Sequence, residues 1–163
     1  MKARYWLPIV TLFLLSSSSS SSSSSMESES PTKSECGVLV DSFFQLTHKE
    51  QLAQFSTFDL DRRYVTYICG VRAIHPQTLY LAYAFSKEGK IAFPFLAKKL
   101  LETRNDSSFR EIIYVLSEMQ RRKTYDVVAE KDLMLYMEKR ASEIQDKFWR
   151  EYTQKLIGEI THP

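Results

Sequence analysis

The sequence predicts an all-α fold of stacked antiparallel helix pairs, arranged as a right-handed helical array or as a compact helical bundle. Apolar residues recur every three or four positions through most of the chain after residue 35, which is the period of an amphipathic helix. The β-branched residues do not alternate with polar ones, and no Asn-Gly hairpin turn occurs, so strands are not expected. Four glycines and five prolines among 163 residues are few enough to leave long helices.

The first 25 residues have the features of a secretory signal peptide followed by a serine tract. Lys2 and Arg4 give a positive start, residues 7–15 form a short apolar run, and residues 16–25 are all serine. A membrane-spanning helix needs about 20 apolar residues, and this run is shorter. We therefore expect export to the periplasm or the medium, with no stable membrane insertion after signal cleavage. An uncleaved anchor, or a true start at Met26, are the alternatives.

The rest of the chain divides into a short polar segment and one domain. Residues 26–35 lack aromatic side chains and are predicted to form a disordered tether, whereas residues 36–163 are predicted to form a single helical domain. The chain has 22 basic and 20 acidic residues; leaving out Lys2 and Arg4 makes both totals 20. A domain without net charge lacks the basic footprint of nucleic-acid-binding proteins, so we expect no nucleic-acid partner.

The first helices follow from apolar spacing and from capping residues. Residues 38–46 place their apolar side chains on one helical face. Thr47 and Glu50 then form a capping-box motif, in which each side chain satisfies a free amide at a helix start. Asp59 is predicted to open the next helix, which ends near Ile74.

The stretch GKIAFPFLAKKLL, residues 89–101, contains a proline in an otherwise helical pattern. A helix is predicted over residues 76–88, with proline at its first position and Gly89 as the left-handed residue that ends it. Pro94 then lies in the first turn of the next helix, where proline loses no hydrogen bond, and this helix continues to about Thr103.

Two further helical regions complete the domain. Ser108 and Glu111 fit a second capping box, and the helix that follows has an apolar face up to Met119. Residues 130–160 repeat apolar side chains every three or four positions and are expected to form one long helix, or two short ones with a break near Asp146.

Residues 89–120 resemble a HEAT-type helical repeat. In that family a first helix opens with an apolar-Pro-x-Leu motif, a turn contains Asp, and a second helix has Arg near its start. The matching residues are Phe93-Pro94-Phe95-Leu96, Leu100-Leu101, Asp106, Arg110, Ile113, Leu116 and Met119. The second helix departs from the family, because Ile112-Ile113-Tyr114 replaces the usual small alanines. The resemblance implies a HEAT-like protein-binding scaffold without catalytic residues, in which stacked pairs bury each other's apolar faces.

Cys36 and Cys69 are the only cysteines. In an exported protein an even number of cysteines favours a disulfide, which would stabilise the fold by about 3 to 4 kcal/mol by closing a loop of this length. The alternative is two free thiols, with Cys69 packed on its helix as a small apolar side chain.

No residue pattern indicates a catalytic, cofactor-binding or metal site. The chain has no Gly-x-Ser-x-Gly motif and no glycine-rich phosphate loop. His48, His75 and His162 are isolated and lack metal-ligand spacing. We therefore expect no cofactor.

Four residues are candidates for contact with a protein partner: Trp149, Arg150, Arg121 and Arg122. Trp and Arg are enriched among the residues that dominate binding energy at interfaces. Each also has a structural alternative. An aromatic stripe at helical spacing commonly faces the core, and basic residues at a helix C-terminus commonly cap its carbonyl groups.

The sequence favours an exported, non-catalytic helical module for protein–protein interaction. One alternative is a periplasmic immunity-type or inhibitor-type protein that neutralises one secreted enzyme, which would have the same fold but one tight cognate partner. A second alternative is a hydrolase that uses Cys36 or Cys69 as its nucleophile. Function retained after both cysteines are changed to serine would exclude the hydrolase.

The export hypothesis can be tested by fusing residues 1–35 to a reporter that is active only outside the cytoplasm. The fusion should be active, and deletion of residues 7–15 should abolish the signal, because the apolar run is the part recognised during export. Equal reporter activity with and without residues 7–15 would show that the run is not a targeting element.

Overall fold

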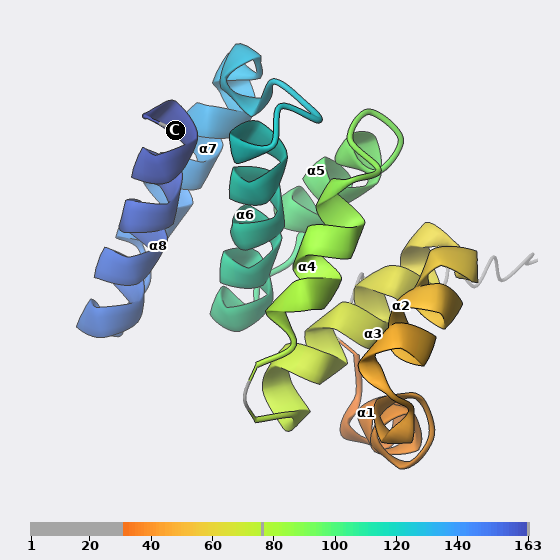
Figure 1. Cartoon of the computed structure of the whole chain (residues 1–163). Helices are drawn as coiled ribbons and strands as arrows, with labels where there is room; N and C mark the ends of the chain where they lie inside the picture. Colours follow the sequence, from red (N-terminus) through yellow and green to blue (C-terminus); the bar gives the residue numbers. More distant parts are fainter. Residues whose placement is uncertain (1–30, 76, 163) are drawn as a thin grey trace, which may run out of the picture.

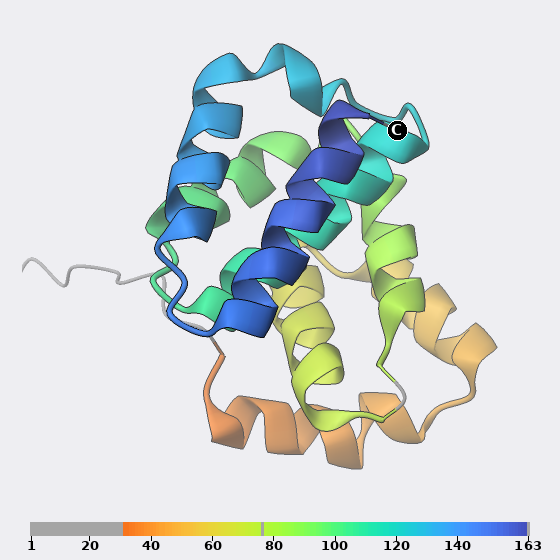
Figure 2. The same cartoon turned by 90° about the vertical axis from the view of Figure 1, so that its left-hand side faces the viewer.

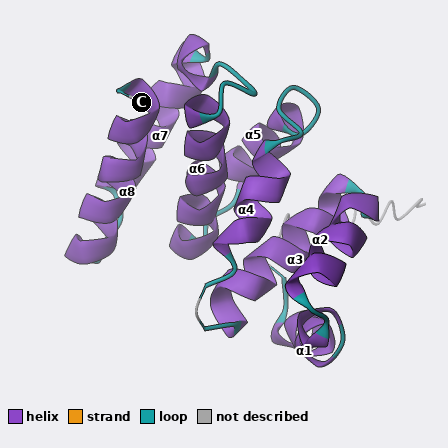
Figure 3. Ribbon diagram, in the orientation of Figure 1, coloured by secondary structure: helices purple, strands orange, loops and turns teal. Residues whose placement is uncertain are grey.

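The computed structural model describes residues 31–75 and 77–162, and all regular structure within them is helical (Figures 1 and 3). The prediction of an all-α fold is confirmed. The α-helices are α1 (Lys33–Asp41), α2 (His48–Thr57), α3 (Leu60–Ala73), α4 (Leu79–Ser86), α5 (Phe93–Glu102), α6 (Asp106–Arg121), α7 (Lys131–Ser142) and α8 (Lys147–Thr161). Two 3₁₀ turns, η1 (Phe43–Gln45) and η2 (Val127–Ala129), precede α2 and α7. The predicted signal peptide and most of the predicted tether lie outside the described residues.

The last six helices form three consecutive pairs in which the chain reverses direction: α3 with α4, α5 with α6, and α7 with α8 (Figures 1 and 2). The second helices of the pairs lie side by side and run the same way, with α6 packed between α4 and α8. At the N-terminal end, α1 packs against α3 and α2 packs against α4. Antiparallel helix pairs therefore stack on one another, as the sequence predicts.

The first helix begins earlier than predicted. α1 starts at Lys33 rather than near residue 38, so three residues assigned to the tether, 33–35, are helical. Thr32 and Glu35 explain this start, because they form a capping box: the Thr32 hydroxyl accepts from the Glu35 amide, and the Glu35 carboxylate accepts from the Thr32 amide.

The helix expected over residues 38–46 is divided in two. α1 ends at Asp41, and after Ser42 the chain continues as η1. The Ser42 hydroxyl donates a 2.6 Å hydrogen bond to the Val38 carbonyl. Serine hydroxyls compete in this way with the amides that would extend a helix.

Two of the predicted helix starts are confirmed by their caps. Thr47 and Glu50 form the capping box of α2. The side chain of Asp59 caps α3. The break expected near Asp146 is also present, because the Asp146 side chain accepts a hydrogen bond from the Trp149 amide and starts α8.

The capping box predicted at Ser108 and Glu111 is wrong. α6 begins at Asp106, and its cap is Asn105, whose side-chain oxygen accepts a 2.9 Å hydrogen bond from the Ser108 amide. Ser108 and Glu111 lie inside the helix and are buried. Asn caps a helix as well as Ser does, so the sequence contains two potential starts one turn apart.

α4 begins at Leu79 rather than at residue 76, and Pro76 lies outside the described residues. The backbone of Thr78, with ψ of 50°, is not yet helical. Gly89 follows α4 with φ of +48°, the left-handed conformation predicted for it. A Cβ at Gly89 would also lie 2.4 Å from the Thr124 carbonyl oxygen, so both backbone conformation and packing require glycine.

Pro94 lies in the first turn of α5, as predicted. The preceding Phe93 ring stacks on Tyr125 with 3.9 Å between centroids, which ties the start of α5 to the segment after α6. Leu96 and Leu100 are fully buried in the one hydrophobic core, to which all eight helices contribute side chains within the described residues.

α6 is the most enclosed part of this core. It contacts α4, α5, α8 and η2 and is buried along most of its length. In the described part of the chain, no helix is long and apolar enough to cross a lipid bilayer.

Truncation of Leu100 to alanine should lower the free energy of unfolding by about 2 to 5 kcal/mol, because it removes buried methyl groups and leaves a cavity; Leu96→Ala should do the same. Lys98→Ala, on the exposed side of α5, should change it by less than about 0.5 kcal/mol. Pro94→Ala should have a mild effect. Chemical denaturation measures the free energy of unfolding of the four variants. If Leu100→Ala left it unchanged, or if Pro94→Ala raised it strongly, the assignment of the α5 start would be wrong.

Candidate functional site

Five aromatic side chains form a surface strip across α8, α6 and α4. The strip consists of Phe148, Trp149 and Tyr152 on α8, Tyr114 on α6 and Tyr83 on α4. Ring centroids are 4.8 Å apart for Phe148 and Trp149, 6.1 Å for Trp149 and Tyr152, and 6.5 Å for Tyr83 and Tyr114. The Tyr114 hydroxyl donates a 3.3 Å hydrogen bond to the Tyr83 hydroxyl. These five residues are called the aromatic strip below.

The α8 end of the aromatic strip is open to solvent. Phe148, Trp149 and Tyr152 expose 65%, 38% and 37% of their surface. Tyr152 is three residues after Trp149 and four after Phe148, so the three rings lie near one another on the helix, while Leu156 and Ile160 face the core. Clustered exposed aromatic side chains are typical of interaction surfaces. Trp149 is too exposed to be a core residue, so the alternative in which this aromatic stripe faces the core is wrong for Trp149.

A pocket of about 230 Å³ adjoins the strip. Its walls come from α4, α6 and α8 and from the segment before α4. The lining residues are Gln77, Leu79, Arg110, Glu111, Tyr114, Phe148, Trp149, Tyr152 and Leu156. Most of the lining is apolar or aromatic; the exceptions are Gln77 and the two charged side chains, Arg110 and Glu111.

Arg110 and Glu111 form a buried ion pair beside this pocket. They expose only 8% and 5% of their surface, and the Arg110 Nη2 donates to the Glu111 Oε1 at 2.9 Å. The Arg110 guanidinium also lies over the Trp149 ring, 3.9 Å from its centroid, a cation–π contact between α6 and α8. The Tyr67 hydroxyl on α3 donates to the Glu111 carboxylate at 3.3 Å. The ion pair thus connects three helices.

Burial shifts the pKa values of Glu111 and of the neighbouring Tyr67. Loss of solvent raises the pKa of the Glu111 carboxyl above its ordinary value, and the neighbouring Arg110 only partly opposes this. Burial, followed by the nearby Glu111 charge, raises the pKa of Tyr67 as well.

The other end of the strip lies at the C-terminus of α6. The Arg122 guanidinium is over the Tyr83 ring at 4.9 Å, and its Nε donates to Glu118 at 3.0 Å. Arg121 also pairs with Glu118, and its side chain is largely exposed. Arg122 therefore extends the aromatic strip, whereas Arg121 lies beside it at the helix end.

Arg150 does not belong to the strip. Its Nη1 donates to the carbonyl oxygens of Ile144 and Gln145 at 2.7 and 3.4 Å. These are the last residues before the Asp146 cap, so Arg150 stabilises the turn between α7 and α8.

Five residues of this surface are not among the four candidates from the sequence: Phe148, Tyr152, Tyr83, Tyr114 and Arg110. Phe148 and Tyr152 lie beside the candidate Trp149 on α8, whereas Tyr83 and Tyr114 lie on helices whose pairing with α8 is not visible in local spacing. Arg110 was noted only as a position of the HEAT-type motif. No local pattern marks Arg110, because its neighbours on the helix face include the polar residues at positions 106, 107 and 117.

Cys36 and Cys69 are joined by a disulfide, with 5.0 Å between their Cα atoms, which links α1 to α3. Neither sulfur is therefore a free thiol in this state. Within residues 31–75 and 77–162, no group of three or more His, Cys, Asp or Glu side chains could hold a metal ion.

Comparisons of the chain with protein-family models, with curated proteins and with solved structures found no match. The function is therefore inferred from the geometry of the surface just described.

The raised pKa of Glu111 predicts how the free energy of unfolding changes with pH. The folded state binds the Glu111 proton more tightly than the unfolded state does, so this group stabilises the protein at low pH. The free energy of unfolding should lose this contribution as the pH rises from 4.5, the ordinary value for glutamate, through the higher folded pKa. Glu111→Gln should flatten this part of the curve, measured by urea unfolding from pH 4.5 to neutrality. An unchanged slope in the variant would contradict the assignment to Glu111.

Proposed function

We propose that this chain is an exported, non-catalytic helical module that binds another protein through the aromatic strip. The observation that carries the proposal is the exposed Phe148–Trp149–Tyr152 cluster next to the buried Arg110–Glu111 pair. Trp, Tyr and Arg are the residue types that dominate binding energy at protein interfaces, and their rigid rings lose little conformational freedom on binding.

The dimensions of the pocket favour a protein partner over a small molecule. Pockets for small ligands commonly have volumes of about 300 to 1,000 Å³. The volume here is about 230 Å³, which suits one or two side chains of a partner that covers the whole strip.

The charges near the pocket favour an apolar or aromatic contact. The Arg110 charge is already paired with Glu111, and Arg121 and Arg122 are paired with Glu118. Arg121 and Arg122 share the single Glu118 carboxylate, so only one positive charge is left over at this end, which is far from the basic patch of a nucleic-acid-binding surface. A partner that presents an apolar side chain to the pocket and hydrogen-bonding groups to the tyrosine hydroxyls would leave the ion pairs intact.

Two features support export. The first 25 residues have the pattern of a signal peptide, and the Cys36–Cys69 disulfide is the kind of bond that persists in oxidising compartments. The same disulfide counts against a cysteine hydrolase, because a bonded sulfur cannot act as a thiolate nucleophile.

The HEAT-like interpretation is also part of the proposal. The stacking of three helix pairs supports it, since extended surfaces built by stacked pairs are what such scaffolds use for binding. A scaffold is expected to bind several partners or to assemble, whereas an immunity-type protein would bind one partner tightly.

The proposal can be tested by placing a photoreactive phenylalanine analogue at position 148 and irradiating the protein in an extract of the cell envelope. A matched variant carries the analogue at Leu135 on α7, which is 64% exposed and therefore presents a similar apolar surface. A partner protein should crosslink from position 148 and not from position 135. Equal crosslinking from both positions would contradict a specific surface on α8.

The affinity for the purified partner then tests the named side chains. Trp149→Ala should weaken binding by roughly 30-fold or more, about 2 kcal/mol, because it removes a ring expected to be central to the interface. Leu135→Ala, which removes an even more exposed apolar side chain elsewhere, should leave the Kd within about twofold. An unchanged Kd for Trp149→Ala would contradict the proposal, and one tight partner rather than several would favour the immunity-type alternative.

A further inference from the structure

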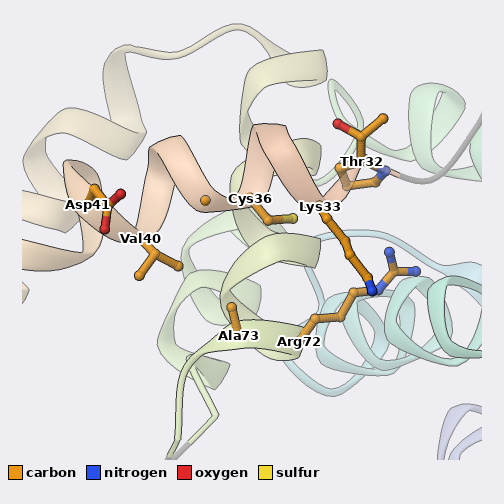
Figure 4. A pocket seen from close by; sticks show the side chains of 9 residues that line it. Thr32, Lys33, Cys36, Val40, Asp41, Arg72 and Ala73 are labelled. Carbon is orange, nitrogen blue, oxygen red and sulfur yellow. The ribbon is translucent and has the colours of Figure 1, made fainter.

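A second and larger pocket lies between α1 and the end of α3, on residues that share nothing with the pocket beside the aromatic strip (Figure 4). Its volume is about 500 Å³. The lining residues are Pro31, Thr32, Lys33, Cys36, Gly37, Val40, Asp41, Arg72 and Ala73. This volume is within the range of about 300 to 1,000 Å³ that small-molecule sites commonly have.

The middle of this pocket is apolar. Cys36, through its disulfide carbon and sulfur atoms, lines it together with Gly37, Val40 and Ala73. Gly37 has no side chain, and a Cβ added there would meet no atom within 4 Å. The pocket is therefore unfilled next to Gly37, and a larger side chain at this position would occupy it.

One end of the pocket is cationic. Figure 4 shows the side chains of Lys33 and Arg72 extending toward the same end of the view, while Asp41 lies at the opposite end. The Arg72 Nη2 donates to Asn105 Oδ1 at 3.0 Å and to Ser108 Oγ at 2.7 Å, and both of these acceptors are neutral.

Neither of these two positive charges is paired with a carboxylate in the part of the chain that the structure describes. Among the described residues, no carboxylate lies within ion-pair distance of either Lys33 or Arg72, and the nearby Glu111 carboxylate is already paired with Arg110. Burial lowers the pKa of Arg72, and the nearby Tyr64 and Glu111 only partly oppose this. Lys33 is also the first residue of α1, where the helix dipole favours an anion and disfavours a cation.

We propose that this pocket binds a free fatty acid, with the hydrocarbon chain along Gly37, Val40 and Ala73 and the carboxylate between Lys33 and Arg72. The carboxylate would supply a counter-charge that no described residue provides, and it would form charge-assisted hydrogen bonds with both cations. Asp41 at the far end would repel a carboxylate, so the charges at the two ends also define the direction of the ligand.

The proposal can be tested by titrating the disulfide-bonded protein with dodecanoate below its micelle concentration, using isothermal titration calorimetry. Dodecanol, which has the same chain without the charge, is the matched ligand. Dodecanoate should bind at one site, and dodecanol should bind at least about tenfold more weakly, because a hydrogen bond to a charged group is worth more than one to a hydroxyl.

Three variants locate the site. Lys33→Gln, at an exposed position that folding should tolerate, should weaken dodecanoate binding about tenfold and leave dodecanol unchanged. Gly37→Leu should remove the binding of both ligands by filling the pocket. Lys90→Gln is the control: it removes one positive charge from an exposed position elsewhere and should leave the affinities for both ligands unchanged. Thermal unfolding by circular dichroism confirms that each variant is folded.

Several outcomes would overturn the proposal. Equal affinity for dodecanol and dodecanoate, or no effect of Lys33→Gln, would remove the carboxylate site. Dodecanoate binding that survives Gly37→Leu in a folded protein would place the ligand elsewhere. Binding to phosphatidylglycerol vesicles without binding to monomeric dodecanoate would mean that this face contacts an anionic lipid surface, and not a free fatty acid.

Discussion

The burial of α6 on most of its sides is the constraint on which the rest of the structure depends. α4 and α8 pack on either side of it, and α5 and η2 also contact it. Apolar side chains such as Ile112, Ile113 and Leu116 are fully removed from water, so shifting the helix by one residue would expose them. Because α4 and α8 touch α6 and run parallel to it, α6 fixes which of their side chains come together at the surface (Figures 1 and 2). The aromatic strip is a consequence of this packing.

The Arg110–Glu111 pair is the costly feature of this arrangement. Taking two charges out of water costs several kcal/mol each, and their attraction repays this only when the geometry is good and further hydrogen bonds are made. Here the Tyr67 hydroxyl bonds to Glu111, and the Trp149 ring covers Arg110. These contacts connect α8 to α6 and α6 to α3. One face of the Trp149 ring thus packs on the Arg110 guanidinium, and the exposed part of the ring remains accessible to a partner.

The sequence predicted the features of this fold that depend on near neighbours in the chain. The Thr47–Glu50 capping box, the left-handed Gly89 and the position of Pro94 in the first turn of α5 are local, and each is present. The start of α6 was misplaced because Asn105 and Ser108 are equally good caps, and only the burial of Ser108 decides between them. The aromatic strip could be predicted only in part. Trp149 was identified by residue type, but its contact with Arg110 and the approach of Tyr83 to Tyr114 depend on how distant helices pack.

The first turns of α6 also connect the two candidate sites. Asn105 Oδ1 accepts hydrogen bonds from the Ser108 amide and from Arg72, so the residue that caps α6 also holds the cationic end of the α1–α3 pocket. One turn further along, Arg110 and Glu111 form the charged part of the pocket beside the aromatic strip. α1 is held against α3 separately, by the Cys36–Cys69 disulfide and by the packing of Leu39 in the core. Arg72 therefore keeps its place through α6, and Lys33 keeps its place through α1. The backbone positions from which these two cations extend are therefore set by two separate contacts, the α1–α3 disulfide and the hydrogen bond from Arg72 to α6.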